Sequence, residues 1–186
     1  MTEKRLLLHC CCGPCSAYPV SLLLDRGVIC FFSNSNIYPA LEYQERLLSF
    51  KKNCLIEGVS FVEDLYEHEN WLETVKGFAS EPERGERCRL CFDFRLRRSF
   101  EFAKSQNIKY IASTLTIAPY KDSEMVFNVA RELSKEYGVE FEEYNFKKKD
   151  GYLKTRNLSR ERELYMQGYC GCEFSLNDLR RKNGQS

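Results

Sequence analysis

The feature that most constrains this 186-residue chain is the grouping of its cysteines. Seven of the ten lie in three short segments near the start, the middle and the end of the chain: Cys11, Cys12 and Cys15; Cys88 and Cys91; Cys170 and Cys172. Structural thiols usually occur as single buried residues, and we expect Cys30 and Cys54 to be of this kind. Grouped thiols bind metal, carry out redox chemistry or form disulfides, and only folding can bring these three segments together.

Length and composition indicate the compartment. A chain of 186 residues can bury a full hydrophobic core without disulfides, so we expect one domain over residues 1–186. The apolar run 6–8 is too short for a signal peptide, and no run approaches the roughly 20 residues of a membrane span. We therefore expect a cytoplasmic protein with reduced thiols, where such spacings more often hold metal or act in redox chemistry.

Charge is unevenly distributed along the chain, although the net charge is only +1. Residues 84–98 carry six arginines, and residues 147–186 carry ten basic residues against five acidic ones. These two basic stretches contain the second and third cysteine groups. Charged helix faces are commonly only solvated, but the alternative is a basic rim around a metal site, suited to a phosphate-rich partner. We predict that residues 147–186 close the metal site.

Hydrophobic periodicity predicts alternating strands and helices. Strands are expected at 4–9, 28–32, 59–62, 110–112 and 139–144. Helices are expected at 17–24, 39–57, 70–78, 90–106, 123–137, 159–167 and 175–181, with a polar loop at 147–157. Such alternation predicts an α/β, doubly wound, mainly parallel five-stranded sheet of Rossmann-like type, with a cysteine-rich C-terminal helical segment.

The same topology predicts where the site lies. In doubly wound sheets ligands bind at the carboxyl ends of the strands. The first cysteine group follows the first strand directly, and the loops 34–38 and 114–120 follow the second and fourth strands. We expect these three segments at one edge of the sheet.

Spacing alone leaves three kinds of site open. The pairs Cys12–Cys15 and Cys88–Cys91 have the spacing of a closed zinc tetrahedron. Cys12-Gly13-Pro14-Cys15 after a strand is typical of a thiol-redox pair. Both interpretations leave several grouped cysteines without a role. An iron–sulfur cluster takes four thiolates and leaves three for a second metal site or for chemistry.

Several segments carry a resemblance to a known family. They are residues 7–15, residues 36–39 with Glu42, Tyr43 and Arg46, residues 87–92 with Arg95 and Leu96, residues 113–121, and residues 165–175. In this order they resemble the cobalamin-independent epoxyqueuosine reductases (QueH-type). The resemblance implies a PP-loop-like (HUP) fold, as in ATP-dependent tRNA-thiolating enzymes. It also implies an iron–sulfur cofactor and reduction of epoxyqueuosine in tRNA to queuosine.

Two departures qualify what the resemblance implies. Cys10 stands where the family has a variable small residue, so we leave it out of the ligand set. The pyrophosphate-binding Ser-Gly-Gly-x-Asp-Ser motif of the thiolating enzymes is replaced by the cysteine run, so ATP chemistry does not carry over.

The expected cofactors follow from the reaction. Removal of an epoxide oxygen consumes two electrons and two protons, which a cofactor and an external electron donor must supply. We predict a [4Fe–4S] cluster and a second metal ion, iron or alternatively zinc, held among the seven grouped cysteines. The partner is tRNA carrying epoxyqueuosine in the anticodon loop. The alternatives are a zinc-stabilised tRNA-binding module and a thiol-redox protein.

Further residues complete the predicted site. Proton donors or ligands are expected among Asp93, Tyr120 and Lys121. Substrate or tRNA contacts are expected from Asn36, Tyr38, Arg87, Arg97 and Lys148. For each of these residues the alternative is a structural role. His9, at the end of the first strand, is expected to be packed and hydrogen-bonded.

Overall fold

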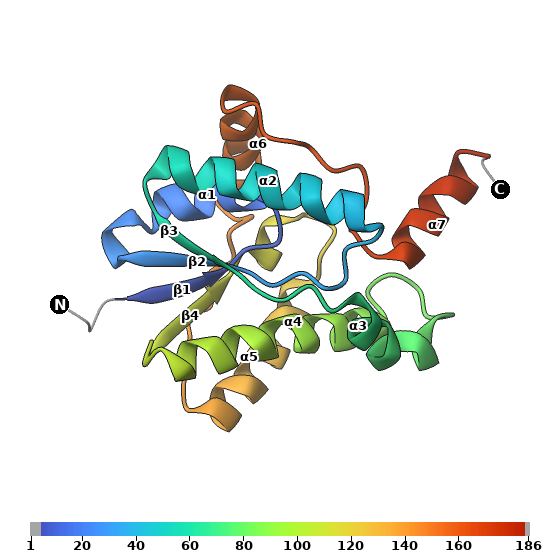
Figure 1. Ribbon diagram of the computed structural model, residues 1–186, viewed down its shortest axis with the longest axis horizontal. Helices are drawn as coiled ribbons and strands as arrows, with labels where there is room; N and C mark the ends of the chain where they lie inside the picture. The colour runs from blue at the N-terminus through green and yellow to red at the C-terminus, as the bar shows by residue number, and fades with distance from the viewer. Residues whose placement is uncertain (1–4, 185–186) are drawn as a thin grey trace.

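The structure of the chain, a computed structural model, describes residues 5–184 and is built on a parallel five-stranded sheet (Figure 1). The strands are β1 (Leu6–His9), β2 (Val28–Phe32), β3 (Ser60–Glu63), β4 (Tyr110–Ser113) and β5 (Glu140–Phe141). Their order across the sheet is β3-β2-β1-β4-β5, with every neighbouring pair parallel. The predicted doubly wound α/β fold is confirmed.

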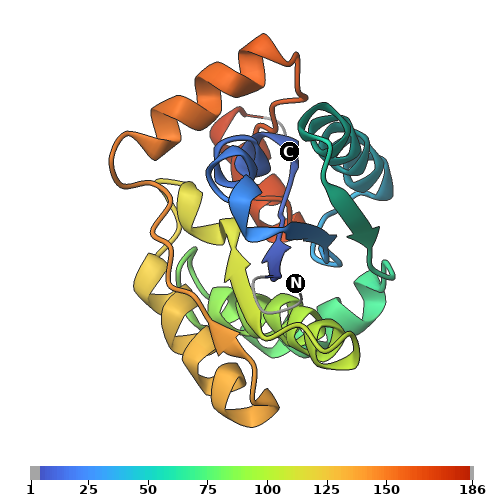
Figure 2. The ribbon, with the colours of Figure 1, turned by 90° about the vertical axis from the view of Figure 1, so that its left-hand side faces the viewer.

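Helices cover both faces of the sheet (Figures 1 and 2). One layer holds α1 (Gly13–Leu22), α2 (Ala40–Glu57) and α6 (Gly151–Glu161), and the other holds α3 (His68–Val75), α4 (Glu86–Ser105) and α5 (Ser123–Tyr137). Short 3-10 turns are η2 (Leu24–Arg26), η3 (Lys76–Phe78) and η4 (Thr114–Ile117). The last helix, α7 (Glu173–Lys182), projects from the side of the protein.

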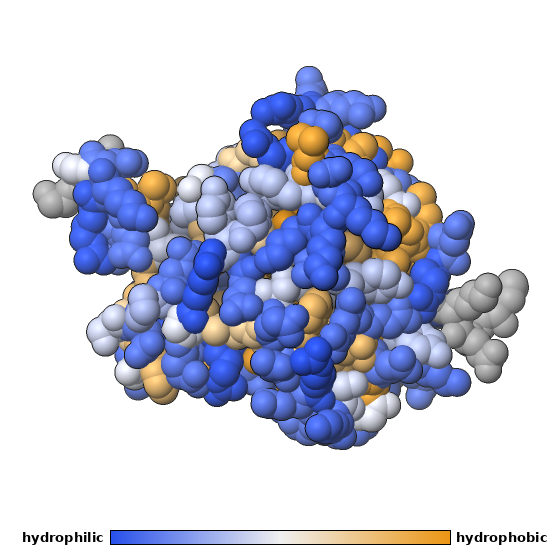
Figure 3. Space-filling view, turned by 180° about the vertical axis from the view of Figure 1, so that it is seen from behind, coloured by the Kyte–Doolittle hydropathy of each residue, from blue (hydrophilic) through white to orange (hydrophobic). Residues whose placement is uncertain are grey.

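The central strand β1 is enclosed by these layers. Leu6, Leu7 and Leu8 are completely buried, as expected for a parallel strand covered by helices on both faces. Seen from behind, the surface is mostly hydrophilic with separate apolar patches, and α7 stands apart from the body (Figure 3). Among residues 5–184, no helix is both long enough and apolar enough to cross a bilayer.

Two expectations in the C-terminal part were wrong. The predicted loop 147–157 contains most of α6, and the helix predicted at 159–167 is not formed beyond Glu161. The buried face of α6 is made of small and hydroxylated residues, so it carries no apolar pattern. Thr155 Oγ1 donates a hydrogen bond to the carbonyl oxygen of Pro14 at 2.6 Å, and Ser159 is completely buried.

Smaller differences concern the ends of elements. The helix expected from residue 90 begins at Glu86, which places Cys88 and Cys91 together on its first turns. The strand expected at 139–144 is only Glu140–Phe141. The first strand was expected from Lys4, which lies outside the described residues. Helix α5 has the predicted limits and ends at Gly138, whose φ of 68° is in the left-handed region.

Candidate metal centre and active site

Three cysteines lie where β1 runs into α1. Their sulfur atoms all lie within 4.8 Å of one another, and all three residues are buried. Cys12 is the N-cap of α1, and its Sγ accepts a hydrogen bond from the backbone N of Cys15 at 3.3 Å. A helix N-terminus favours negative charge, so this position stabilises thiolates. Cys11, Cys12 and Cys15, here the β1 thiol group, can bind a metal ion.

The three thiols of this group do not ionise alike. Hydrogen bonds from Cys12 and Cys15 hold the pKa of Cys11 well below its usual value, with a further contribution from the charge of Lys121. Burial raises the pKa of Cys12 to about 12, and hydrogen bonding to Cys11 and Cys12 raises the pKa of Cys15. Cys11 is therefore the thiol of this group that loses its proton most readily, and a thiolate there suits a cationic ligand.

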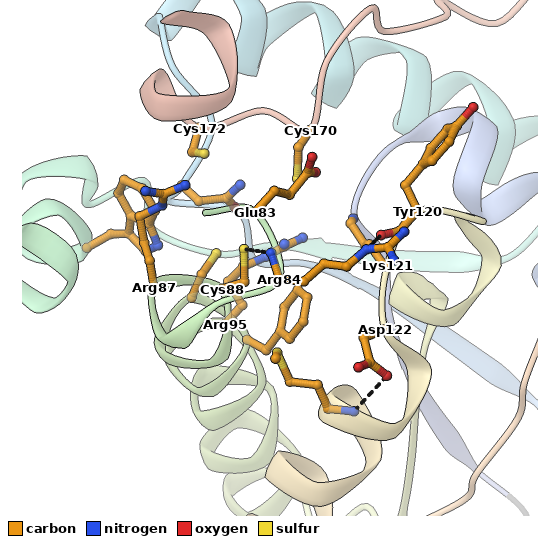
Figure 4. A pocket seen from close by; sticks show the side chains of 15 residues that line it. Glu83, Arg84, Arg87, Cys88, Arg95, Tyr120, Lys121, Asp122, Cys170 and Cys172 are labelled. Atoms are coloured by element: carbon orange, nitrogen blue, oxygen red, sulfur yellow. Dashed lines mark hydrogen bonds between the residues drawn. The ribbon is translucent and has the colours of Figure 1, made fainter. Parts of the chain in front are cut away.

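The other four grouped cysteines line one pocket (Figure 4). Cys88 and Cys91 are one turn apart on α4, and therefore share a helix face. Cys170 and Cys172 come from the segment before α7 and lie across the pocket from Cys88. Cys172 is the N-cap of α7, as Cys12 is of α1. These four residues, here the α4–α7 thiol group, supply the number of thiolates that an iron–sulfur cluster or a structural zinc ion takes.

Burial dominates the acidity of three cysteines of the α4–α7 thiol group, Cys88, Cys91 and Cys172. It raises the pKa of Cys88 and Cys91, and the neighbouring Cys170 raises both further. It also raises the pKa of Cys172 to about 11. Metal ligation requires thiolates, so binding here releases protons and strengthens as pH rises.

Lys121 carries positive charge between the two thiol groups. It lines the α4–α7 pocket and also a neighbouring cleft that Cys15 and Cys170 share. Burial lowers its pKa, but the charges of Cys11 and Cys170 outweigh burial, so the pKa is raised. The ammonium group therefore stays protonated at neutral pH beside both sets of sulfurs.

A buried arginine fixes the C-terminal cysteine segment. Arg46 is 2% exposed and donates hydrogen bonds to the carbonyl oxygens of Cys170 at 2.9 Å and Tyr169 at 3.0 Å. Its Nε is paired with Glu42 Oε1 at 2.7 Å. Gly171 has φ of 131°, and a Cβ there would lie 2.8 Å from Arg46 Nη1. Both the backbone conformation and the close approach require glycine at this position.

His9 is packed and hydrogen-bonded, as predicted. Its Nδ1 lies 2.9 Å from Ser113 Oγ and its Nε2 lies 3.1 Å from the carbonyl oxygen of Ser33. Burial first, and then the charge of Arg95, lower its pKa to about 3. The neutral ring therefore joins the carboxyl ends of β1, β2 and β4 under the cysteine loop.

Four of the other predicted site residues line the α4–α7 pocket: Asn36, Arg87, Tyr120 and Lys121. The Asn36 Oδ1 atom is buried without a hydrogen-bond partner among the described residues. Arg87 donates from Nη1 to the carbonyl oxygens of Ala79 and Glu81, which orders the loop before α4.

The remaining four are not among the residues that line the pocket or the cleft. Asp93 and Arg97 pair with each other at 3.2 Å, and Arg97 also contacts Glu136 at 2.5 Å. Tyr38 stacks on His68 with ring centroids 5.3 Å apart. Lys148 is exposed in the turn before α6.

Two residues of the site were not expected from the sequence. Trp71, the only tryptophan of the chain, is completely buried and lines the α4–α7 pocket. Gln167 donates from Nε2 to Cys12 Sγ at 3.0 Å. Trp71 was visible in the sequence only as an isolated tryptophan in an acidic stretch, and Gln167 only as part of the family-like segment 165–175.

The excluded Cys10 lies apart from the β1 thiol group. Its thiol donates to the carbonyl oxygen of Leu8 at 3.4 Å, and burial raises its pKa to about 11. Cys10, Cys30 and Cys54 are all completely buried in the hydrophobic core.

Comparison with known families agrees with this arrangement. The family model described as Epoxyqueuosine reductase QueH matches residues 6–178, which include all seven grouped cysteines. The chain belongs to the epoxyqueuosine reductase QueH family. The resemblance seen in the sequence is thus confirmed.

Individual relatives of the QueH family match over nearly the whole chain. The Epoxyqueuosine reductase QueH of Acinetobacter baylyi is 35% identical over 180 residues, covering 95% of this chain and 83% of the relative. That of Streptococcus pyogenes is 35% identical, covering 93% and 71%. That of Thermotoga maritima is 32% identical over 183 residues, covering 97% and 94%.

Proposed function

We propose that this chain is an epoxyqueuosine reductase that converts epoxyqueuosine in tRNA to queuosine. In that reaction the epoxide gains two electrons and two protons, both C–O bonds break, an alkene forms and water leaves. The observation that carries the proposal is the convergence of seven cysteines in two neighbouring groups, in a chain of the QueH family. Thiolate-bound metal provides the redox cofactor that side chains alone lack.

The donor sets fit the two predicted cofactors. The α4–α7 thiol group offers the four thiolates of a [4Fe–4S] cluster. The β1 thiol group offers three sulfurs to a second metal ion, iron or alternatively zinc. When bound, these groups supply electrons one at a time and a Lewis acid for the epoxide oxygen.

Lys121 is the best-placed proton donor of the three candidates. Its raised pKa keeps the ammonium protonated, and it lines the space beside both thiol groups. Tyr120 also lines both the pocket and the cleft, and its hydroxyl is an alternative donor. Asp93 remains a weaker candidate, since its carboxylate pairs with Arg97. The electrons come from an external donor.

The basic C-terminal segment supports the tRNA partner. Residues 147–186 carry Cys170 and Cys172 and an excess of basic residues, so we propose that this segment closes the metal site and brings positive charge to it. Together with Asn36, Tyr38, Arg87, Arg97 and Lys148, it is proposed to hold the anticodon loop. Reduced thiols of this kind suit the cytoplasm.

The decisive experiment is anaerobic purification followed by iron, sulfide and zinc analysis and an assay on tRNA that contains epoxyqueuosine. We expect a brown protein with iron and acid-labile sulfide, and queuosine among the nucleosides of the digested tRNA. Stoichiometric zinc without sulfide, together with tRNA binding but no turnover, would instead establish a zinc-stabilised RNA-binding module.

A further inference from the structure

A cleft lies beside the two thiol groups, between α1, α6, α7 and the loop 117–121. We propose that this cleft takes a single nucleotide flipped out of an RNA loop, with its base against aromatic side chains and its phosphates at the cations of α6 and α7. This inference rests on the proposed function and adds where the modified nucleoside binds.

The volume of the cleft fits such a ligand. It measures about 420 Å³, within the roughly 300–1,000 Å³ typical of small-molecule sites. Because α1, α6, α7 and the loop 117–121 all line it, we expect a base to enter only after it has left its stack. Flipping a base out of a loop costs little, since loop bases are only partly stacked.

The cleft reaches both thiol groups. Cys15 belongs to the β1 thiol group and Cys170 to the α4–α7 thiol group, and both line the cleft. Gln167 also lines it, and its Nε2 connects the cleft wall to Cys12. An epoxide carried on the base would therefore lie beside both sets of sulfurs and beside Lys121.

The walls are rich in aromatic and apolar side chains. Tyr120 is 71% exposed, Met166 49% and Tyr152 36%, although each lines a concave site. Tyr169, Ile117 and Pro119 complete these walls. Exposed aromatic faces beside a cleft are the usual platforms for unpaired bases, because every base has a π-face.

Five charged residues line the cleft, and three of them are the cations Lys121, Arg156 and Lys182. Arg156 lies over the ring of Tyr152, with its Cζ 6.0 Å from the ring centroid, and Lys182 lines the cleft from α7. The two carboxylates are those of Glu83 and Asp178, and Asp178 is paired with Arg181 at 2.6 Å. The ring of Tyr152 can stack on a base, and the guanidinium of Arg156 beside it can bind the phosphate of the same nucleotide.

Two pairs of variants on α6 test the proposal. Tyr152→Ala removes a cleft wall, whereas Leu153→Ala removes a neighbouring exposed side chain that does not line the cleft. Arg156→Gln removes a charge from the cleft, whereas Arg160→Gln removes the same charge one turn further along α6. If the charge acted only over a long range, Arg156→Gln and Arg160→Gln would weaken RNA binding equally.

The readouts are the affinity of the iron-loaded protein for an anticodon stem–loop RNA, and kcat and KM on the natural substrate. We expect Tyr152→Ala to weaken binding at least about fivefold, because the base loses an aromatic face on which to stack. We expect Arg156→Gln to raise KM several-fold. Iron and sulfide content should stay at the wild-type level in all four variants.

Equal behaviour of Tyr152→Ala and Leu153→Ala in an active enzyme would overturn the cleft assignment and leave the proposed function standing. Wild-type protein that holds iron and sulfide but never forms queuosine would instead refute the proposed function. Tyr152→Phe, which keeps the ring, should behave like wild type if stacking is the contact.

Discussion

Arg46 and Cys170 are 124 residues apart in sequence, and the guanidinium Nη1 of Arg46 donates to the carbonyl oxygen of Cys170 at 2.9 Å. Through this bond and a second one to Tyr169, a helix of the N-terminal half fixes the path of the C-terminal cysteine segment. The arginine contacts backbone, not sulfur, so it acts as a positioning residue for the thiols of Cys170 and Cys172.

Loss of this arginine should therefore reduce metal binding. In Arg46→Gln we expect iron and sulfide per chain to fall below half of wild type, and Glu42 to lose its buried partner. Removing one member of a buried pair costs about 3–5 kcal/mol, measurable by denaturant unfolding. Arg46→Lys should not restore the metal content, since an ammonium cannot span two carbonyls as a guanidinium does. Wild-type iron in both variants would contradict the positioning role.

Alanine substitutions should affect the cysteines of the site and those of the hydrophobic core differently. Replacing any one of the seven grouped cysteines by alanine should abolish turnover, and Cys91→Ala should also lose iron and sulfide. Cys30→Ala and Cys54→Ala should keep both and cost on the order of 1 kcal/mol through lost packing. Full activity with two or more of the seven replaced would show that fewer than seven cysteines are required for the reaction.

Gly13 should tolerate no side chain. A Cβ at this position would lie 2.6 Å from the backbone oxygen of Ser49, where α1 and α2 approach closely. Gly13→Ala should destabilise the protein by about 1–3 kcal/mol and displace Cys12 and Cys15. Gly77→Ala, where a Cβ meets nothing within 4 Å, is the matched control and should leave thermal unfolding unchanged.

Acid should weaken the ion pair between Arg26 and Glu142, whose closest atoms are 2.5 Å apart. Burial raises the pKa of Glu142, but the hydrogen bonds and charge of Arg26, with Tyr144, lower it more, so the net pKa is lowered. The pair thus stabilises the fold above the unfolded value of 4.5, and this contribution is lost as pH falls through the lower folded pKa.

Urea unfolding of wild type and Glu142→Gln should accordingly differ by about 1 kcal/mol at pH 7. The difference should shrink below a pH of about 4.5. Glu132→Gln removes an exposed carboxylate with no ion pair among the described residues, and should show neither effect. A difference that grows in acid would contradict the sign of the shift.

Binding of tRNA should fall as salt rises, because each phosphate contact releases counterions. Lys148→Glu should weaken binding and reduce the salt slope while leaving the visible spectrum unchanged. Lys109→Glu makes the same charge change at the amino end of β4, on the edge away from the site. If both variants weaken binding equally, net charge and not a local contact determines affinity.

The sequence by itself determined the fold class, the family and the set of seven cysteines. Alternating apolar runs indicated the doubly wound sheet for two reasons. Buried parallel strands must be apolar, and successive parallel strands are connected by helices along the chain. The grouped thiols were visible because ligand residues must stand at close spacings on a loop or on one helix face. His9 was also placed correctly, since a polar residue at the end of a buried strand needs partners.

Only the tertiary structure decided how the thiols are divided and what holds them. The separation into Cys11, Cys12 and Cys15 and into the four remaining cysteines depends on contacts between segments more than 70 residues apart along the chain. The roles of Arg46, Trp71 and Gln167 depend on contacts between segments that are distant in sequence. Such contacts cannot be predicted from the local sequence around each residue. Helix α6 escaped prediction for the same reason: its buried face pairs hydroxyl groups with backbone oxygen atoms, a form of burial that hydrophobic periodicity cannot indicate.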